Sequence, residues 1–270
     1  MLGRVLLLAA GVSSALLARE GSRLRMAALL RSLTLCCWWT RQRVLSLWLV
    51  EHDLCPADSV RLIGGVDISF IKGSETDACA ALVILNAHTL EVVYHSCRRI
   101  VLTASYIPGY LAFREVGFLL QLLDEQRSSS PECTPDLIFV DGNGILHPNR
   151  FGLACHLGVL SGIPTVGVGK TLHHVDGLTK DIVLKLATSI DRAGEHALLV
   201  GASGAVWGAL LRTTSPVQGN FKPVAVSVGH GMSLDSAIRL VWRTCKHRIP
   251  EPIRQADLRS REWLRRNGAV

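Results

Sequence analysis

The stretch from residue 136 to residue 168, DLIFVDGNGILHPNRFGLACHLGVLSGIPTVGV, decides the fold class of this chain. It begins with DLIFV (136–140), a short and mainly apolar run of the kind that forms a strand buried on both faces of a sheet. A helical run follows at 151–161 and a second buried strand at 164–168. Strand, helix and strand in this order predict a right-handed crossover between parallel strands, and therefore an α/β protein.

The residues before this stretch predict an antiparallel sheet. Strand-like runs at 62–70, 78–85 and 90–98 are separated by short polar turns, so consecutive strands should pair as a meander. A helix is expected from Pro108 to about Gln126, since proline is tolerated in a first turn, where its missing N–H would be unpaired anyway.

The residues after the stretch add two strands and a helix. Strands are expected near 205–212 and 223–228, and Ser233 is placed to cap a helix that runs to about Arg243. The chain therefore predicts an α/β fold with a mixed sheet, in which an antiparallel meander leads into parallel β-α-β units flanked by helices.

The N-terminal part of the chain differs from the rest in composition. Residues 1–50 hold seven arginines and one acid, so most of the formal net charge of +7 is local to them and says little about a polyanionic partner. Residues 1–40 fit a mitochondrial or secretory targeting segment, and equally an N-terminus that carries no address. We divide the chain into an N-terminal extension, disordered or targeting (1–60), a folded domain (61–262) and a tail (263–270).

The eight cysteines do not form a metal-binding pattern. They contain no CxxC pair and no Cys/His set at zinc spacing. Cys79, Cys97 and Cys155 lie in apolar runs, where a free cysteine acts as a small hydrophobic side chain. Because intracellular proteins seldom keep disulfides, we expect reduced thiols and an intracellular protein.

Three acidic residues stand where an ordinary fold would place apolar or surface side chains. Asp67 lies in the centre of an apolar strand, Glu115 lies on the apolar stripe of its helix, and Asp141 ends the strand DLIFV. Each has a structural alternative. Asp67 could face solvent at a sheet edge, Glu115 could pair with Arg114 or Arg99, and Asp141 could head a turn.

Taken together, these acids favour a metal site. Converging carboxylates repel one another unless divalent cations lie between them, and oxygen ligands suit Mg²⁺ or Mn²⁺ better than zinc. Such a site is suited to phosphodiester chemistry. Lys170 and His230 follow predicted strands, so we expect both at the same sheet edge as Asp141. Lys170 would neutralise the scissile phosphate and His230 would orient or deprotonate water, unless His230 only caps the helix at Ser233.

Several long strings, in order, resemble the endonuclease V family, which nicks nucleic acid near deaminated adenine. They are GGVDISF, LTASYIPGYLAFRE, DLIFVDGNGILHPNRFGLACHLGVL, PTVGVGK, VSVGHGMSLDSA and RIPEPIRQAD. The resemblance covers about residues 61–262 and implies a ribonuclease H-like fold. It marks that range as the catalytic domain.

The resemblance also implies roles for individual residues. Asp67, Glu115 and Asp141 match the metal-binding acids, Lys170 matches the active-site lysine, and His230 matches a histidine that supports the metal site. Tyr106, followed by Ile107 and Pro108, corresponds to the wedge that fills the gap left by a displaced base. The pocket for that base corresponds to Gly142, Asn143, Gly144 and His147.

The function implied is a Mg²⁺-dependent endonuclease, with Mn²⁺ able to substitute. Its substrate would be single-stranded or structured RNA that contains inosine, with deoxyinosine DNA as a further candidate. Cleavage would fall at the second phosphodiester 3′ to the inosine and leave 5′-phosphate and 3′-hydroxyl ends. We expect a monomer without a stable membrane span, in the cytoplasm and the nucleus, nucleolus included. The alternative is a catalytically weak inosine-binding variant in which the N-terminal helix is disrupted.

Overall fold

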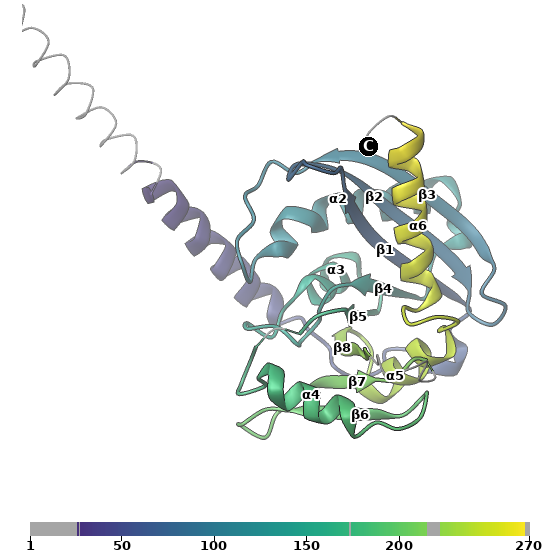
Figure 1. Cartoon of the computed structure of the whole chain (residues 1–270). Coiled ribbons are helices and arrows are strands. Elements are labelled where there is room, and N and C mark those ends of the chain that lie inside the picture. The colour runs from purple at the N-terminus through teal and green to yellow at the C-terminus, as the bar shows by residue number, and fades with distance from the viewer. Residues whose placement is uncertain (1–25, 27, 173, 215–221, 268–270) are drawn as a thin grey trace, which may run out of the picture. The chain divides into compact units, whose positions relative to one another are not determined.

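The computed structural model of the chain describes residue 26 and residues 28–172, 174–214 and 222–267 (Figure 1). The chain divides into two compact units, Met1–Val44 and Leu45–Val270. In the first unit residues 28–44 are helical, while most of the segment considered for targeting lies outside the described residues. Among the described helices, none combines the length and the apolar character needed to cross a membrane.

The second unit is built on one sheet whose strands alternate with helices. The strands are β1 (Leu62–Phe70), β2 (Asp77–Asn86), β3 (Val92–Val101), β4 (Leu137–Asp141), β5 (Thr165–Gly169), β6 (His196–Val200), β7 (Val206–Leu211) and β8 (Val224–His230). The helices are α2 (Leu111–Ser129), α3 (Leu153–Ser161), α4 (Lys180–Thr188), α5 (Leu234–Arg243) and α6 (Glu251–Arg266), with the short 3-10 helices η1 (Ala57–Ser59) and η2 (Pro131–Cys133).

The sheet is mixed, as the sequence predicts. Its strand order is β3-β2-β1-β4-β5-β8-β7-β6. The first three strands pair as the expected antiparallel meander, and β1, β4 and β5 run parallel. The remaining strands differ from a simple run of parallel units, because β8 pairs antiparallel with both β5 and β7. This reversal decides which end of β8 reaches the acidic residues.

Most element boundaries agree with the sequence to within a few residues, and β1 matches exactly. The helix expected from Pro108 begins instead at Leu111, because Gly109 adopts a φ of +83° that no helical residue has. The Ser233 cap is confirmed, since its side chain accepts a hydrogen bond from the Ser236 N–H. The sequence patterns predict neither the helices α4 and α6, nor the strand β6, nor the short 3-10 helices η1 and η2.

Helices cover both faces of the sheet, and the side chains of β2 show which helices pack on which face. Its side chains point alternately to opposite faces. Ala80, Leu82 and Ile84 pack in one apolar cluster with residues of α2 and α3, whereas Ala81, Val83 and Leu85 pack in another with Ala256 of α6. Figure 1 shows α6 lying along β1 and β2. The acids of β1 and β4 therefore have α2 on one side and α6 on the other.

Residues 45–60, which we assigned to the N-terminal extension, are packed into the second unit. Leu45 and Leu49 join an apolar cluster with Phe151 and Cys155, while Ala57 and Val60 belong to the main core. Asp53 accepts hydrogen bonds from the Ser233 N–H (2.6 Å) and from the Ser236 hydroxyl (2.7 Å), which ties this segment to the start of α5. At the other end, part of the predicted tail, 263–266, completes α6.

Candidate active site

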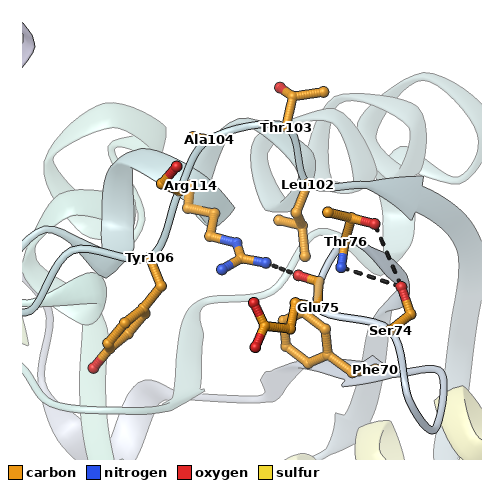
Figure 2. A pocket seen from close by; sticks show the side chains of 10 residues that line it. Phe70, Ser74, Glu75, Thr76, Leu102, Thr103, Ala104, Tyr106 and Arg114 are labelled. Atoms are coloured by element: carbon orange, nitrogen blue, oxygen red, sulfur yellow. Dashed lines mark hydrogen bonds between the residues drawn. The ribbon is translucent and has the colours of Figure 1, made fainter. Parts of the chain in front are cut away.

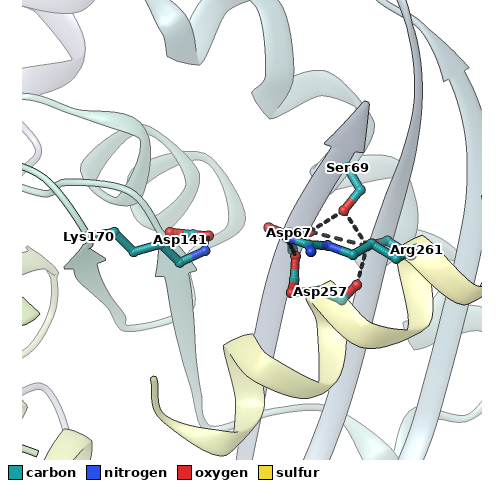
Figure 3. Close-up of polar contacts among 7 residues, drawn as sticks. Asp67, Ser69, Asp141, Lys170, Asp257 and Arg261 are labelled. Atoms are coloured by element: carbon teal, nitrogen blue, oxygen red, sulfur yellow. Dashed lines mark hydrogen bonds and ion pairs between the residues drawn. The ribbon is translucent and has the colours of Figure 1, made fainter. Parts of the chain in front are cut away.

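Asp67 and Asp141 lie side by side on neighbouring parallel strands. Each is one residue beyond the paired Val66 and Val140 of β1 and β4. Asp67 is only 9% exposed and accepts hydrogen bonds from the hydroxyls of Ser69 (3.0 Å) and Ser260 (3.2 Å). The solvent-facing alternative for Asp67 is therefore excluded, and the hydroxyls fix its carboxylate toward α6 (Figure 3).

Glu115 reaches the same pair of acids from the opposite face. It is 7% exposed and lines a small cavity of about 220 Å³ together with Asp67, Asp141, Leu119 and Leu153. Among the described residues no ion pair to Arg114 or Arg99 is formed, since Arg114 bonds the Glu75 carbonyl and Arg99 pairs with Asp77. The apolar stripe of α2 thus carries a buried carboxylate aimed at the sheet, as its periodicity predicts.

Burial and neighbouring negative charge raise the pKa values of Asp67 and Glu115. Burial raises the pKa of Asp67 to about 6, and the negative charges of Asp141 and Asp257 add to this effect. Burial likewise raises the pKa of Glu115 to about 7; the nearby charge of Arg114 opposes the shift, while Asp67 and Asp141 reinforce it. The negative charge of these buried acids is not fully balanced by nearby positive groups, and a bound cation would relieve the repulsion.

Lys170 supplies one positive charge. It follows β5, and its Nζ lies 2.5 Å from Oδ2 of Asp141 (Figure 3). Burial alone would lower the pKa of Lys170, but the hydrogen bond to Asp141 and the charges of Asp141, Asp67 and Asp257 raise it. The lysine therefore stays protonated beside the acids, at the sheet edge where we expected it.

Asp257 of α6 is a fourth acid at this site, and our sequence reasoning missed it. It lines a cleft of about 720 Å³ with Asp67, Asp141 and Lys170, and its carboxylate pairs with Arg261 at 2.8 Å (Figure 3). Asp257 could have been found as Glu115 was, as an acidic residue beside the apolar face of a helix. Asp257 borders the buried side of its helix, next to Ala256 and one turn before Ser260.

His230 is not at this edge, so the prediction that placed it there is wrong. Because β8 runs antiparallel to β5, His230 pairs with Thr165 at the start of β5, whereas Asp141 pairs with Val168 near its end. The imidazole is buried, and burial lowers its pKa. Its Nδ1 accepts a hydrogen bond from the Val50 N–H at 3.3 Å. The capping alternative also fails, since Ser233 and Asp53 occupy that helix start.

We therefore expect His230→Ala to reduce stability and spare the chemistry. Loss of a buried acceptor should lower the free energy of unfolding by about 1–3 kcal/mol. Any activity of the acidic site with a divalent cation should change by less than about threefold, because a structural hydrogen bond adds little to transition-state binding. Thermal melts and single-turnover rates test this, with the exposed His95→Ala as control. A normal melting temperature with a large loss of rate would contradict the structural role.

The residues matched to the wedge and base pocket occupy two adjoining loops. Tyr106, Ile107 and Pro108 lie between β3 and α2, and the Tyr106 side chain is 58% exposed. Gly142, Asn143, Gly144 and His147 lie between β4 and α3. The two loops approach closely, because a Cβ on Gly109 would lie 4.0 Å from Cε1 of His147.

Backbone packing explains the glycines of the second loop. A Cβ on Gly144 would lie 1.8 Å from the Val228 carbonyl oxygen, so only glycine lets the loop rest on β8. The Gly144 N–H donates to the Ser227 hydroxyl at 2.8 Å. Within the described part of the chain, the buried Oδ1 of Asn143 has no hydrogen-bond partner and is therefore available as an acceptor.

The donor set fits a divalent cation in chemistry and in charge. The side chains that would hold it are Asp67, Asp141, Glu115 and Asp257, all oxygen donors of the kind that Mg²⁺ and Mn²⁺ prefer. Over the described ranges, no three Asp, Glu, His or Cys side chains form a ready-made coordination group. The Lys170 ammonium instead neutralises Asp141, so binding of a cation requires these side chains to adjust.

Fold and site together define the class of the protein as a nuclease, with acidic residues gathered at the centre of a ribonuclease H-like sheet. Residues 45–258 match the family model for endonuclease V. Human endonuclease V is 45% identical over 241 residues, which cover 87% of this chain and 84% of that protein. The chain belongs to the endonuclease V family.

Solved structures agree with this assignment. The catalytic domain of human endonuclease V superposes with a TM-score of 0.84 at 42% identity, covering 88% of this chain and 98% of that one. Endonuclease V of Ciona intestinalis, in complex with a 24mer DNA containing an inosine followed by a ribo-adenosine, gives a TM-score of 0.81 at 32% identity, covering 86% and 98%.

Proposed function

We propose that this protein is a Mg²⁺-dependent endonuclease that cuts inosine-containing RNA, single-stranded or structured, with Mn²⁺ able to substitute. The cut falls at the second phosphodiester 3′ to the inosine and leaves 5′-phosphate and 3′-hydroxyl ends. Deoxyinosine DNA is a second substrate, and the active species is a monomer. The observation that carries the proposal is a pair of cavities that share Asp67 and Asp141. Glu115 lines one of them, and Asp257 and Lys170 line the other.

The chain's own residues supply most of the chemistry. When bound, the cation would activate water and stabilise the charge that develops on the phosphodiester oxygens. Asp67 and Asp141 would hold it at the sheet edge, where Ser69 and Ser260 fix the Asp67 carboxylate. The Lys170 ammonium, which pairs with Asp141 in the free protein, would keep its proton and pair instead with the scissile phosphate. Glu115, which reaches the same acids from the opposite face of the sheet, would complete the set of carboxylates around the cation.

Inosine recognition falls to the two adjoining loops. A base that must be read by an enzyme has to leave its stack, and an exposed aromatic side chain can fill the gap. Tyr106 is such a side chain, and the glycine-rich loop at 142–144 brings backbone groups close to a displaced base. The complexed relative was crystallised with a 24mer DNA in which the inosine is followed by a single ribo-adenosine. This supports an RNA preference for the present chain, set by contacts to a 2′-hydroxyl.

The test is cleavage of matched inosine RNA and deoxyinosine DNA with Mg²⁺, by the full chain and by a chain that begins at Leu45. We expect both proteins to cut, because the second unit contains all the residues of the proposed site. We also expect both to cut the RNA faster than the DNA. Asp67→Ala and Asp141→Ala should each abolish cutting, since each removes a cation ligand. Binding measured on the same RNA separates the enzyme from a binding protein that lacks catalysis. Full cutting by either alanine variant would contradict the proposal.

A further inference from the structure

A second cleft, next to the acidic one, has no role in the function proposed so far. It encloses about 680 Å³ between the end of β1, the β1–β2 turn and the loop that carries Tyr106 (Figure 2). Its walls include Phe70, Glu75 and Arg114. A cleft of this size is large enough for a small planar ligand.

Phe70 connects this cleft to the acidic centre. It ends β1, three residues after Asp67, and its side chain is 42% exposed. The same residue lines the cleft that contains Asp67, Asp141 and Lys170. The two clefts therefore share Phe70, and a polynucleotide strand passing the acids in this direction meets an exposed aromatic ring.

Arg114 holds the ring and leaves one donor unused. Its guanidinium carbon lies 5.4 Å from the centroid of the Phe70 ring, within the range of a cation–π contact. It also donates a hydrogen bond to the Glu75 carbonyl. Its Nε is buried and has no hydrogen-bond partner among the described residues. A buried donor of this kind costs free energy unless a ligand or water accepts from it.

The charges of the cleft select the kind of ligand. Arg114 and Glu75 both line it, so the formal charges cancel and a phosphate gains little there. The hydroxyls of Ser74 and Thr76 already bond each other at 3.4 Å. A neutral heteroaromatic group remains the best match, because it can stack on Phe70 and offer an acceptor to the guanidinium. Nucleobases have this chemistry.

We propose that the cleft binds an unpaired base of the substrate strand that flanks the inosine, stacked on Phe70 with Arg114 at its edge. The proposal rests on the proposed function and adds a subsite to it. Tyr106, at the rim of the same cleft, lies across Arg114 from Phe70 in Figure 2. Tyr106, the wedge, and Phe70, the ring on which the flanking base stacks, thus belong to one surface. The substrate must therefore have an unpaired, unstacked nucleotide beside the inosine.

The test is a binding series on the full chain with Ca²⁺ in place of Mg²⁺, so that the RNA is bound without being cut. The probes are inosine RNAs that each lack one flanking base, with the abasic position moved along the strand. One abasic position should weaken binding to the wild type by about tenfold, as expected for a stacked base. Phe70→Leu should bind the intact RNA about tenfold more weakly and no longer distinguish that position, whereas Phe70→Tyr should behave as the wild type.

Trp242→Leu is the matched control, because Trp242 is similarly exposed (38%) but lies on α5. It should keep the wild-type abasic profile. The inference is overturned if Phe70→Leu responds to the abasic positions as the wild type does. It is also overturned if no abasic position weakens binding to the wild type, while inosine RNA still binds better than its adenosine counterpart. Failure of the wild type to prefer inosine RNA at all would overturn the proposed function, and this inference with it.

Discussion

Replacing Asp257 by asparagine is expected to slow cleavage of inosine RNA by at least about a hundredfold. The carboxylate lines the same cleft as Asp67 and Asp141, and its charge contributes to the raised pKa of Asp67. Asparagine keeps the size of the side chain and removes the charge that helps hold a cation. The stabilisation that Mg²⁺ gives to the wild type in a thermal melt should also shrink in this variant.

Glu262→Gln is the control for this prediction. Glu262 lies on the same helix and pairs with Arg266 at 2.6 Å, on a partly exposed surface. Its loss should leave both cleavage and the response to Mg²⁺ unchanged, because exposed ion pairs contribute little. Normal cleavage by Asp257→Asn would show that α6 only packs against the site.

Glu115→Gln is expected to abolish cleavage and yet stabilise the protein without metal at pH 8. The folded protein holds the pKa of Glu115 at about 7, compared with an ordinary value of 4.5. This difference corresponds to about 3 kcal/mol that ionisation of the buried carboxyl costs the folded state. A neutral glutamine does not incur that cost, so its melting temperature without metal should rise by roughly 5 °C or more.

The pH dependence of this gain follows from the direction of the shift. Since the folded pKa lies above the unfolded one, the folded state binds the proton more tightly. Below about pH 4.5 the carboxyl is protonated in both states, and the variant has no advantage. Between 4.5 and about 7 the unfolded state ionises first, so wild-type stability falls as pH rises, and above about 7 the whole penalty is present.

Thermal melts in EDTA at pH 4.5 and pH 8 measure the effect. Glu125→Gln is the control, because Glu125 is on the same helix but exposed and paired with Arg98. It should show no gain at either pH. Added Mg²⁺ should stabilise the wild type at pH 8 more than Glu115→Gln, since the cation neutralises the charge that the variant lacks. A Glu115→Gln protein less stable than the wild type at pH 8 would contradict the repulsion described here.

Local pattern was sufficient for the central elements. The apolar runs at 136–140 and 62–70 predict β4 and β1, because burial on both faces of a sheet leaves a direct mark on composition. The same reasoning placed Glu115, since the period of a helix fixes which residues share a face. By contrast, β6 and α4 carry mixed surface residues, and their exposure weakens any periodic signal.

The sequence by itself therefore determined the fold class, the place of Glu115 on the apolar face of its helix, and the position of Asp141 at a strand end. These depend on residue type and on spacing within a single element. Only the tertiary structure decided which sheet edge each residue reaches. Strand direction depends on pairing between distant segments, and the antiparallel pairing of β8 with β5 removes His230 from the site. Packing of α6 across β1 brings Asp257, far away in the chain, to the same carboxylates.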